Sequence, residues 1–83
     1  MVSKRVIINC PDGIKPYKAN EIVQKSLKYQ SAVNIMYKNN VIDAKSVLTI
    51  LGASIKRNAE IIIECRGADE KEALEDVSMA VAV

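Results

Sequence analysis

The stretch Glu60-Ile61-Ile62-Ile63-Glu64-Cys65-Arg66 decides how this sequence is expected to fold. Alternation of apolar and polar residues over such a run is typical of a β-strand with one buried face. Ile61, Ile63 and Cys65 fall on one face, and the charged residues fall on the other face around Ile62. A strand with one solvated face is typical of an antiparallel sheet that helices cover on one side only.

The residues that follow this strand predict a helix. Gly67 ends the strand, and Asp69 with Glu72 has the spacing of a capping box at a helix N-terminus. Apolar residues then recur at helical spacing, and they form the expected inner stripe of the last helix: Ala73, Leu74, Val77, Ala80 and Val81.

The part of the chain before this strand predicts three more strands and a long helix. Residues 4–9 alternate as a first strand, and residues 32–37 and 41–43 form a β-hairpin. Residues 16–28 predict an amphipathic helix. Its expected buried stripe contains Ala19, Ile22, Val23, Ser26 and Leu27.

A short helix is predicted between the hairpin and the Ile-rich strand. Ser46 is a suitable N-cap for it, and Gly52 is a plausible end. The complete order is strand, helix, strand, strand, short helix, strand, helix. This order predicts an α+β fold, in which helices cover one face of an antiparallel sheet, as a single domain over residues 1–83.

Composition excludes several classes of function. The chain has 83 residues, of which 49% are apolar and 27% charged, so one globular core is expected. Apolar runs are short and no signal-peptide core is present, so we expect a cytoplasmic protein without a membrane partner. A net charge of only +2 and three scattered tyrosines argue against direct nucleic-acid binding.

The chain has two cysteines and no histidine. This set is too small for a structural metal site. It also excludes Ser-His and Cys-His nucleophilic catalysis, and it excludes a phosphohistidine carrier. We therefore expect no enzymatic activity, no metal and no cofactor.

Residues 12–19 form the first candidate site, a glycine-centred loop that leads into the long helix. Pro16 suits the first helical turn, and the unpaired N–H groups of a helix N-terminus attract anions. Lys15 and Lys18 add positive charge there. The same residues are equally compatible with a solvated basic loop that binds nothing.

The short helix forms the second candidate site. Val47, Leu48, Ile50 and Leu51 fall within one and a half turns, so some of these apolar side chains are expected to face outward. Such a patch beside Ser46 suggests a docking surface for another protein. The alternative is that all four side chains belong to the core.

Several short stretches of the sequence form a pattern that runs nearly end to end: Gly13-Ile14, Ala19, Val23-Gln24, Lys45-Ser46-Val47-Leu48, Ile55 and the run from Gly67 to Leu74. In these stretches the sequence resembles the HPr family, the small phosphocarriers of the bacterial sugar phosphotransferase system. The resemblance implies an open-faced β-sandwich with strand order 1-4-2-3 and three helices on one side.

The loop departs from the family pattern, which reads G-I-H-A-R-P-A. Lys15 stands at the position of the phosphorylated histidine, Tyr17 at that of the arginine and Lys18 at that of the proline. A lysine amine, with a reference pKa of about 10.4, is mostly protonated near neutral pH and cannot attack a phosphoryl group. The resemblance therefore does not extend to the carrier chemistry.

A second site of the family is retained. Ser46 stands where many Gram-positive HPr proteins are phosphorylated by a serine kinase, which turns them into regulators of carbon metabolism. In outline the sequence is similar to the histidine-less Crh type. The alternative is that Ser46 only caps its helix.

The resemblance implies a regulatory docking protein with protein partners: a serine HPr kinase, a transcriptional regulator or phosphotransferase-system components. The expected contact residues are Lys15, Tyr17, Lys18, Val47, Leu48 and Leu51. Two other hypotheses are a binder of anions or phosphorylated metabolites at Lys15 and Lys18, and a competitor of the true phosphocarrier. The family fold also implies that Cys10 and Cys65 lie too far apart for a disulfide.

Overall fold

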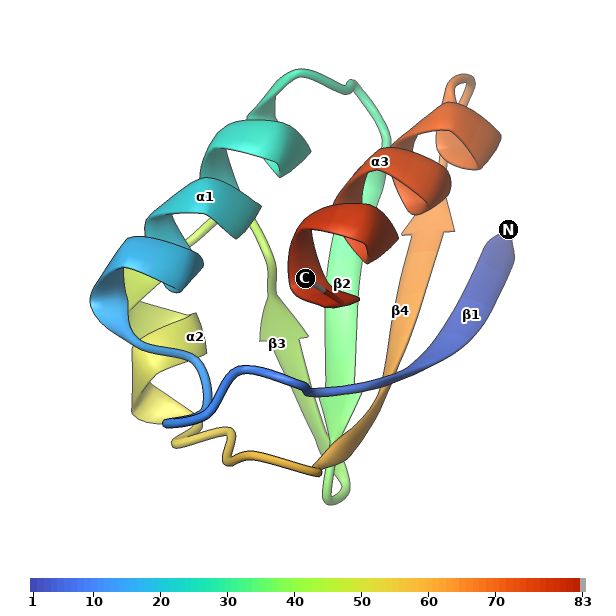
Figure 1. Cartoon of the computed structure of the whole chain (residues 1–83). Helices are drawn as coiled ribbons and strands as arrows, with labels where there is room; N and C mark the ends of the chain where they lie inside the picture. The colour runs from blue at the N-terminus through green and yellow to red at the C-terminus, as the bar shows by residue number, and fades with distance from the viewer. Residues whose placement is uncertain (83) are drawn as a thin grey trace.

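The computed structural model describes residues 1–82, which form four strands and three helices (Figure 1). No helix within these residues combines the length and the apolar character that are needed to cross a membrane. In chain order the elements are β1 (Val2–Ile7), α1 (Pro16–Leu27), β2 (Ala32–Tyr37), β3 (Asn40–Asp43), α2 (Val47–Gly52), β4 (Glu60–Arg66) and α3 (Glu70–Ala82).

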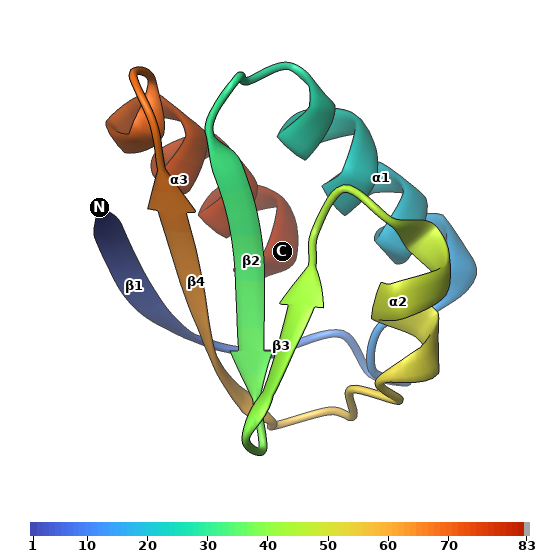
Figure 2. The same ribbon diagram turned by 180° about the vertical axis from the view of Figure 1, so that it is seen from behind.

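The four strands form one antiparallel sheet in the order β1-β4-β2-β3. The helices cover one face of this sheet, and the other face is open (Figures 1 and 2). The α+β class, the strand order and the three helices on one side are confirmed.

The strand β4 occupies the centre of the sheet. It pairs with β1 from Val2↔Cys65 to Ile7↔Glu60, and with β2 from Ala32↔Arg66 to Met36↔Ile62. Its side chains Ile61, Ile63 and Cys65 are fully buried, as the alternation predicts.

The hairpin between β2 and β3 is closed by two residues in the left-handed region. Lys38 has a φ of 47° and Asn39 a φ of 66°. Positive φ at both central residues gives a turn whose twist matches that of the flanking strands. The hairpin predicted over 32–43 is therefore confirmed.

The strand β1 differs from its predicted bounds of 4–9. It covers Val2–Ile7 because its partner begins at Glu60, which lies opposite Ile7. Beyond this point only Ile8 continues the pairing: its N–H donates to the Ala59 carbonyl at 2.9 Å, and its carbonyl accepts from Asn58 N–H at 2.8 Å.

The buried stripe of α1 contains Ala19, Ile22, Val23 and Ser26, as expected, but not Leu27. The Leu27 side chain is 56% exposed. Each helical residue advances the direction of its side chain by about 100°, so Leu27 points roughly 80° away from Ala19 and falls at the margin of the stripe.

The capping box predicted for Asp69 and Glu72 is wrong in its residues. Ala73 N–H donates to the Asp69 carbonyl, but the Asp69 carboxylate accepts from the loop before β2. The reciprocal pair lies two residues earlier: Gly67 N–H donates to Glu70 Oε1 at 3.2 Å, and Glu70 N–H donates to the Gly67 carbonyl at 3.3 Å.

Candidate functional site

The loop before α1 is held in place by the segment that follows α2. Gly13 has a φ of +76°, and a Cβ atom at this position would lie 2.5 Å from the Ile55 carbonyl oxygen. Gly13 N–H donates to the Cys10 carbonyl at 3.0 Å, and Ile14 N–H donates to the Ile55 carbonyl at 3.1 Å. Glycine is required here because the turn needs both the positive φ and the close approach.

The first turn of α1 is open to solvent. Lys15 is the N-cap residue, its side chain makes no capping hydrogen bond, and Pro16 begins the helix. Lys15 and Tyr17 are both exposed. The first turn contains no acidic residue, so no carboxylate of its own offsets the positive end of the helix dipole.

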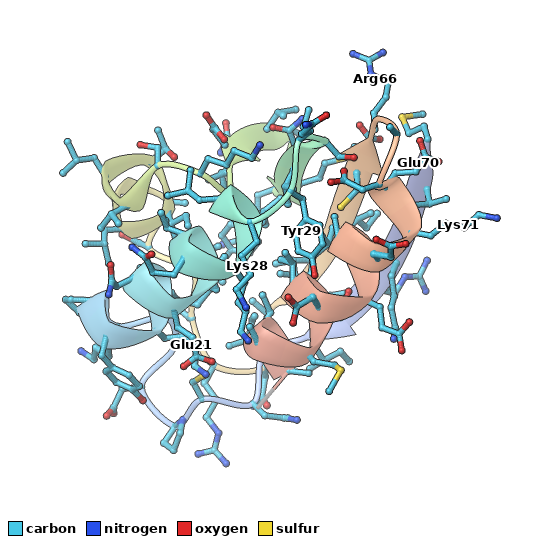
Figure 3. The ribbon with its side chains drawn as sticks, turned by 90° about the horizontal axis from the view of Figure 1, so that it is seen from above. Glu21, Lys28, Tyr29, Arg66, Glu70 and Lys71 are labelled. Atoms are coloured by element: carbon cyan, nitrogen blue, oxygen red, sulfur yellow. The ribbon has the colours of Figure 1, made fainter. Side chains whose placement is uncertain are left out.

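The position of Lys18 contradicts the expectation that it meets an anion or a partner. Its side chain is buried between α1 and α3, where Nζ donates to the Ala80 carbonyl at 3.0 Å and lies 3.5 Å from Glu21 Oε1. Glu21 lies on the side of α1 that faces α3 (Figure 3). Lys18 therefore binds the carbonyl end of α3, and Lys15 alone of the two lysines faces solvent at the loop.

Ser46 caps α2, as predicted. Its Oγ accepts from Thr49 N–H at 3.4 Å, and its own side chain is half-buried. Thr49 Oγ1 donates to the Asp43 carbonyl at 2.8 Å, which ties the first turn of the helix to the end of β3. The N-cap of α2 thus lies in a short segment that hydrogen bonds connect to the end of β3.

The apolar side chains of α2 divide between core and surface. Ile50 is fully buried, whereas Leu48 is 82% exposed. Val47 and Leu51 are half-buried at the margin of the core. The alternative in which all four side chains are core is therefore wrong.

The two candidate sites belong to one side of the molecule. The helix α2 lies beside the first turns of α1 in both views (Figures 1 and 2). Lys15 and Tyr17 come from the start of α1, and Leu48 comes from α2. The sequence-predicted residues other than Lys18 thus belong to two neighbouring elements.

Lys45, one of the residues that carry the resemblance, makes a contact in this region that the sequence did not predict. Its Nζ donates to the Tyr29 carbonyl at 2.9 Å, so the cation next to Ser46 is held at the far end of α1. Nothing in the local sequence signals a contact between residues 16 positions apart. Only the pairing of β2 with β3 brings them together.

Tyr29 also connects α1 to α3. Its hydroxyl donates to Asp76 Oδ2 at 2.7 Å, and its side chain lies between the two helices (Figure 3). This hydrogen bond to a carboxylate raises the pKa of Tyr29 to about 12 and lowers the pKa of Asp76 below its ordinary value.

Comparison with known proteins places the chain in a family. Residues 2–82 match the family model described as "PTS HPr component phosphorylation site". The phosphocarrier protein HPr of Buchnera aphidicola subsp. Schizaphis graminum is 31% identical over 78 residues, which cover 94% of this chain and 92% of the relative. HPr of Buchnera aphidicola subsp. Acyrthosiphon pisum is 29% identical over 79 residues, covering 95% and 93%.

Solved structures agree with this assignment. HPr from Bacillus anthracis superposes with a TM-score of 0.90 at 29% identity and covers 96% of this chain and 95% of its own. Crh from Bacillus subtilis, described as a domain-swapped dimer, superposes with a TM-score of 0.78 at 26% identity and covers 98% and 93%. HPr proteins are phosphocarriers and not enzymes. The chain therefore belongs to the HPr family of the phosphotransferase system.

Proposed function

We propose that this chain is a regulatory, HPr-like docking protein of the cytoplasm that does not carry phosphate on histidine and is switched at Ser46. The observation that carries this proposal is the exposed Leu48 side chain two residues from a half-buried N-cap serine. An exposed leucine on a short helix offers an apolar contact for a partner. The neighbouring hydroxyl offers a place to change the charge of that contact.

The carrier role has no residue to perform it. The chain contains no histidine, and the exposed N-cap position of α1 holds Lys15. In the family pattern that position is the phosphorylated histidine. The loop keeps its glycine turn and its helix start, which support docking without phosphoryl transfer.

Phosphorylation of Ser46 would act on charge more than on shape. A phosphoserine adds about −1.5 to −2 charge at neutral pH, and a helix N-terminus stabilises negative charge. The Ser46 oxygen already accepts from Thr49 N–H, so a phosphate oxygen can take the same donor. The surface beside Leu48 would then become anionic while the fold is retained.

The partners that we propose are proteins of the phosphotransferase system and its regulation: a serine HPr kinase and a transcriptional regulator. Support comes from Crh, which is named as the catabolite repression HPr of Bacillus subtilis and is 25% identical to this chain in its solution structure. That name concerns regulation and not sugar uptake.

The test is phosphorylation by a serine HPr kinase with ATP, followed by intact-mass measurement. We expect one phosphate on the wild type and none on Ser46→Asn. Asparagine is the better control than alanine because it caps a helix as well as serine does. Absence of phosphate on the wild type, or retention of phosphate on the variant, would remove the switch.

Docking needs a separate measurement. Leu48→Ser should weaken partner binding and leave the free energy of unfolding within about 0.5 kcal/mol of the wild type, since the side chain is exposed. The matched control is Val41→Ser, which removes another exposed apolar side chain, on β3. Equal loss of binding in both variants would contradict a contact at α2.

A second candidate function, anion binding at the start of α1, is favoured by exposed Lys15 and by the lack of acidic residues in the first turn. Titration with inorganic phosphate separates the two hypotheses. Amide shifts at residues 15, 17 and 18 that Lys15→Gln abolishes would support an anion site. Competition with an active HPr for its phosphoryl donor tests the third hypothesis, a competitor of the carrier.

A further inference from the structure

We propose that the outer edge of β1, together with α3, is a second docking site, which accepts an extended acidic segment of another protein as an added strand. This site lies on the side of the molecule away from α2 (Figures 1 and 2). It does not depend on Ser46 or on the loop before α1.

The strand β1 ends the sheet on one side, since the order is β1-β4-β2-β3. Ile8 directs its N–H and its carbonyl towards the chain of β4, where they bond Ala59 and Asn58. Backbone groups alternate in direction along a strand, so Ile7, Arg5 and Ser3 direct theirs outward. These groups form an edge onto which another strand can pair.

A groove accompanies this edge between β1 and α3. It contains two hollows, of about 340 Å³ and 250 Å³, and the Lys4 side chain borders both. The walls of the larger hollow include Val6, Ser78 and Met79, and those of the smaller include Val2, Lys71 and Leu74. Two hollows along one edge suit side chains that leave the same face of an added strand.

Ser78 is an unsatisfied polar group in the wall of the larger hollow. The residue is only 3% exposed, and its Oγ has no hydrogen-bond partner within residues 1–82. A buried hydroxyl without a partner is energetically costly. A polar side chain of the added strand would satisfy it once the hydroxyl turns towards the hollow.

The charges on β1 determine which kind of added strand can bind. Lys4 is exposed and forms no ion pair with any of the described residues, while Arg5 lies 3.1 Å from Glu60 on the same sheet. A strand with carboxylates opposite Lys4 and Arg5 would pair favourably with both.

The same charges act against a second copy of this chain. Because only alternate residues of β1 face outward, two antiparallel β1 strands centred on each other would place Lys4 opposite Lys4 or Arg5 opposite Arg5, and like charges directly opposite destabilise a strand pair. Two solved structures of Crh, each 26% identical to this chain, are described as dimers, so pairing with a second copy is an alternative outcome of the test. The charges of β1 favour an acidic segment of a different protein.

The probe is a blocked eight-residue peptide with two adjacent glutamates at its centre and threonine and valine on both sides. We expect it to shift the amide signals of β1 and to slow hydrogen exchange at Ser3, Arg5 and Ile7. The control peptide carries two lysines in place of the glutamates. It should bind at least about tenfold more weakly, because it meets like charges.

Variants of the protein complete the test. Lys4→Glu should reverse the preference between the two peptides, and Ile7→Pro should weaken both, since it removes one outward N–H. Lys28→Glu, at the far end of α1, is the matched charge control and should change neither. The proposal is overturned by no shift in β1 at millimolar peptide, by equal binding of both peptides, or by dimerisation through β1.

Discussion

Lys18 has a different role in the structure from the one that the sequence predicts. Beside Pro16 and Lys15 it predicts a basic loop, but its ammonium group lies against the last turn of α3. The last carbonyl groups of a helix lack intrahelical partners and carry partial negative charge. The buried Lys18 side chain, which belongs to α1, therefore stabilises the C-terminal end of α3.

Replacement of Lys18 by methionine should therefore destabilise the protein. Methionine keeps much of the side-chain volume but leaves the Ala80 carbonyl without its donor. We expect a loss of about 1–3 kcal/mol in the free energy of unfolding, measured with urea. Lys15→Met is the control, since Lys15 is exposed, and should change stability by less than about 0.5 kcal/mol. Equal effects would mean that the buried contact contributes nothing.

Gly13 provides a second prediction for a single residue. Gly13→Ala forces a Cβ atom to within 2.5 Å of the Ile55 carbonyl at a φ of +76°. We expect a loss of about 1–3 kcal/mol in thermal or urea unfolding. Gly52→Ala is the matched control, because nothing lies within 4 Å of its added Cβ. That variant should be neutral or more stable by up to about 1 kcal/mol.

Two carboxylates join α3 to the rest of the chain: that of Asp69, which directly precedes the helix, and that of Asp76 within it. Asp69 accepts from the N–H groups of Gln30 and Ser31 at 3.0 Å and 2.9 Å and also from the Ser31 hydroxyl. Asp76 accepts from Tyr29. Donation from the Ser31 hydroxyl is the main cause that lowers the pKa of Asp69, and donation from Tyr29 does the same for the pKa of Asp76.

These lowered pKa values predict that the free energy of unfolding decreases at acidic pH. A carboxyl whose folded pKa lies below its ordinary value of 3.8 stabilises the fold above that pH, and the contribution is lost as the pH falls through the folded pKa. Asp69→Asn should reduce stability at pH 7 and flatten its decline below about pH 4. Urea unfolding of the wild type and of Asp69→Asn at pH 7 and below about pH 4 measures this difference. An unchanged pH dependence would show that Asp69 is not the group responsible.

A companion prediction concerns Tyr29. Tyr29→Phe removes the hydroxyl that donates to Asp76, so the pKa of Asp76 should rise towards its ordinary value. Carbon-13 NMR of the carboxyl group during a pH titration measures the change. The pKa of Asp69 in the same spectra is the internal control and should stay where it is.

At the scale of the whole molecule, the sequence predicts what depends on neighbouring residues along the chain. The alternation in Glu60–Arg66, the spacing in α1 and the cap at Ser46 are local, and the structure agrees with them. The strand order came from the resemblance to HPr, because alternation says which face of a strand is buried and not which strand lies beside it.

The predictions that the structure contradicts are those for residues whose contacts lie far away in the sequence. The bounds of β1 depend on where β4 begins, at Glu60. The carboxylate of Asp69 binds Ser31, which β2 carries to the end of β4, and Lys18 meets the end of α3. In each case a residue far away in the sequence competes successfully with the local pattern.

The two thiols give a prediction for the molecule as a whole. Cys10 and Cys65 are both buried and form no disulfide, and burial raises the pKa of the Cys65 thiol. Both should react with a thiol reagent only when the protein unfolds, so their labelling rates should agree and should rise together with urea. Rapid labelling of either cysteine in native buffer would contradict this.

The central position of β4 has a consequence for synthesis on the ribosome. The strand that joins β1 to β2 begins only at residue 60, so the first strand has no partner until most of the chain has been made. Before that point only the β2–β3 hairpin can form any of the sheet. The nascent chain must therefore remain open for most of its translation, and completion of the sheet waits for Glu60–Arg66 to leave the exit tunnel.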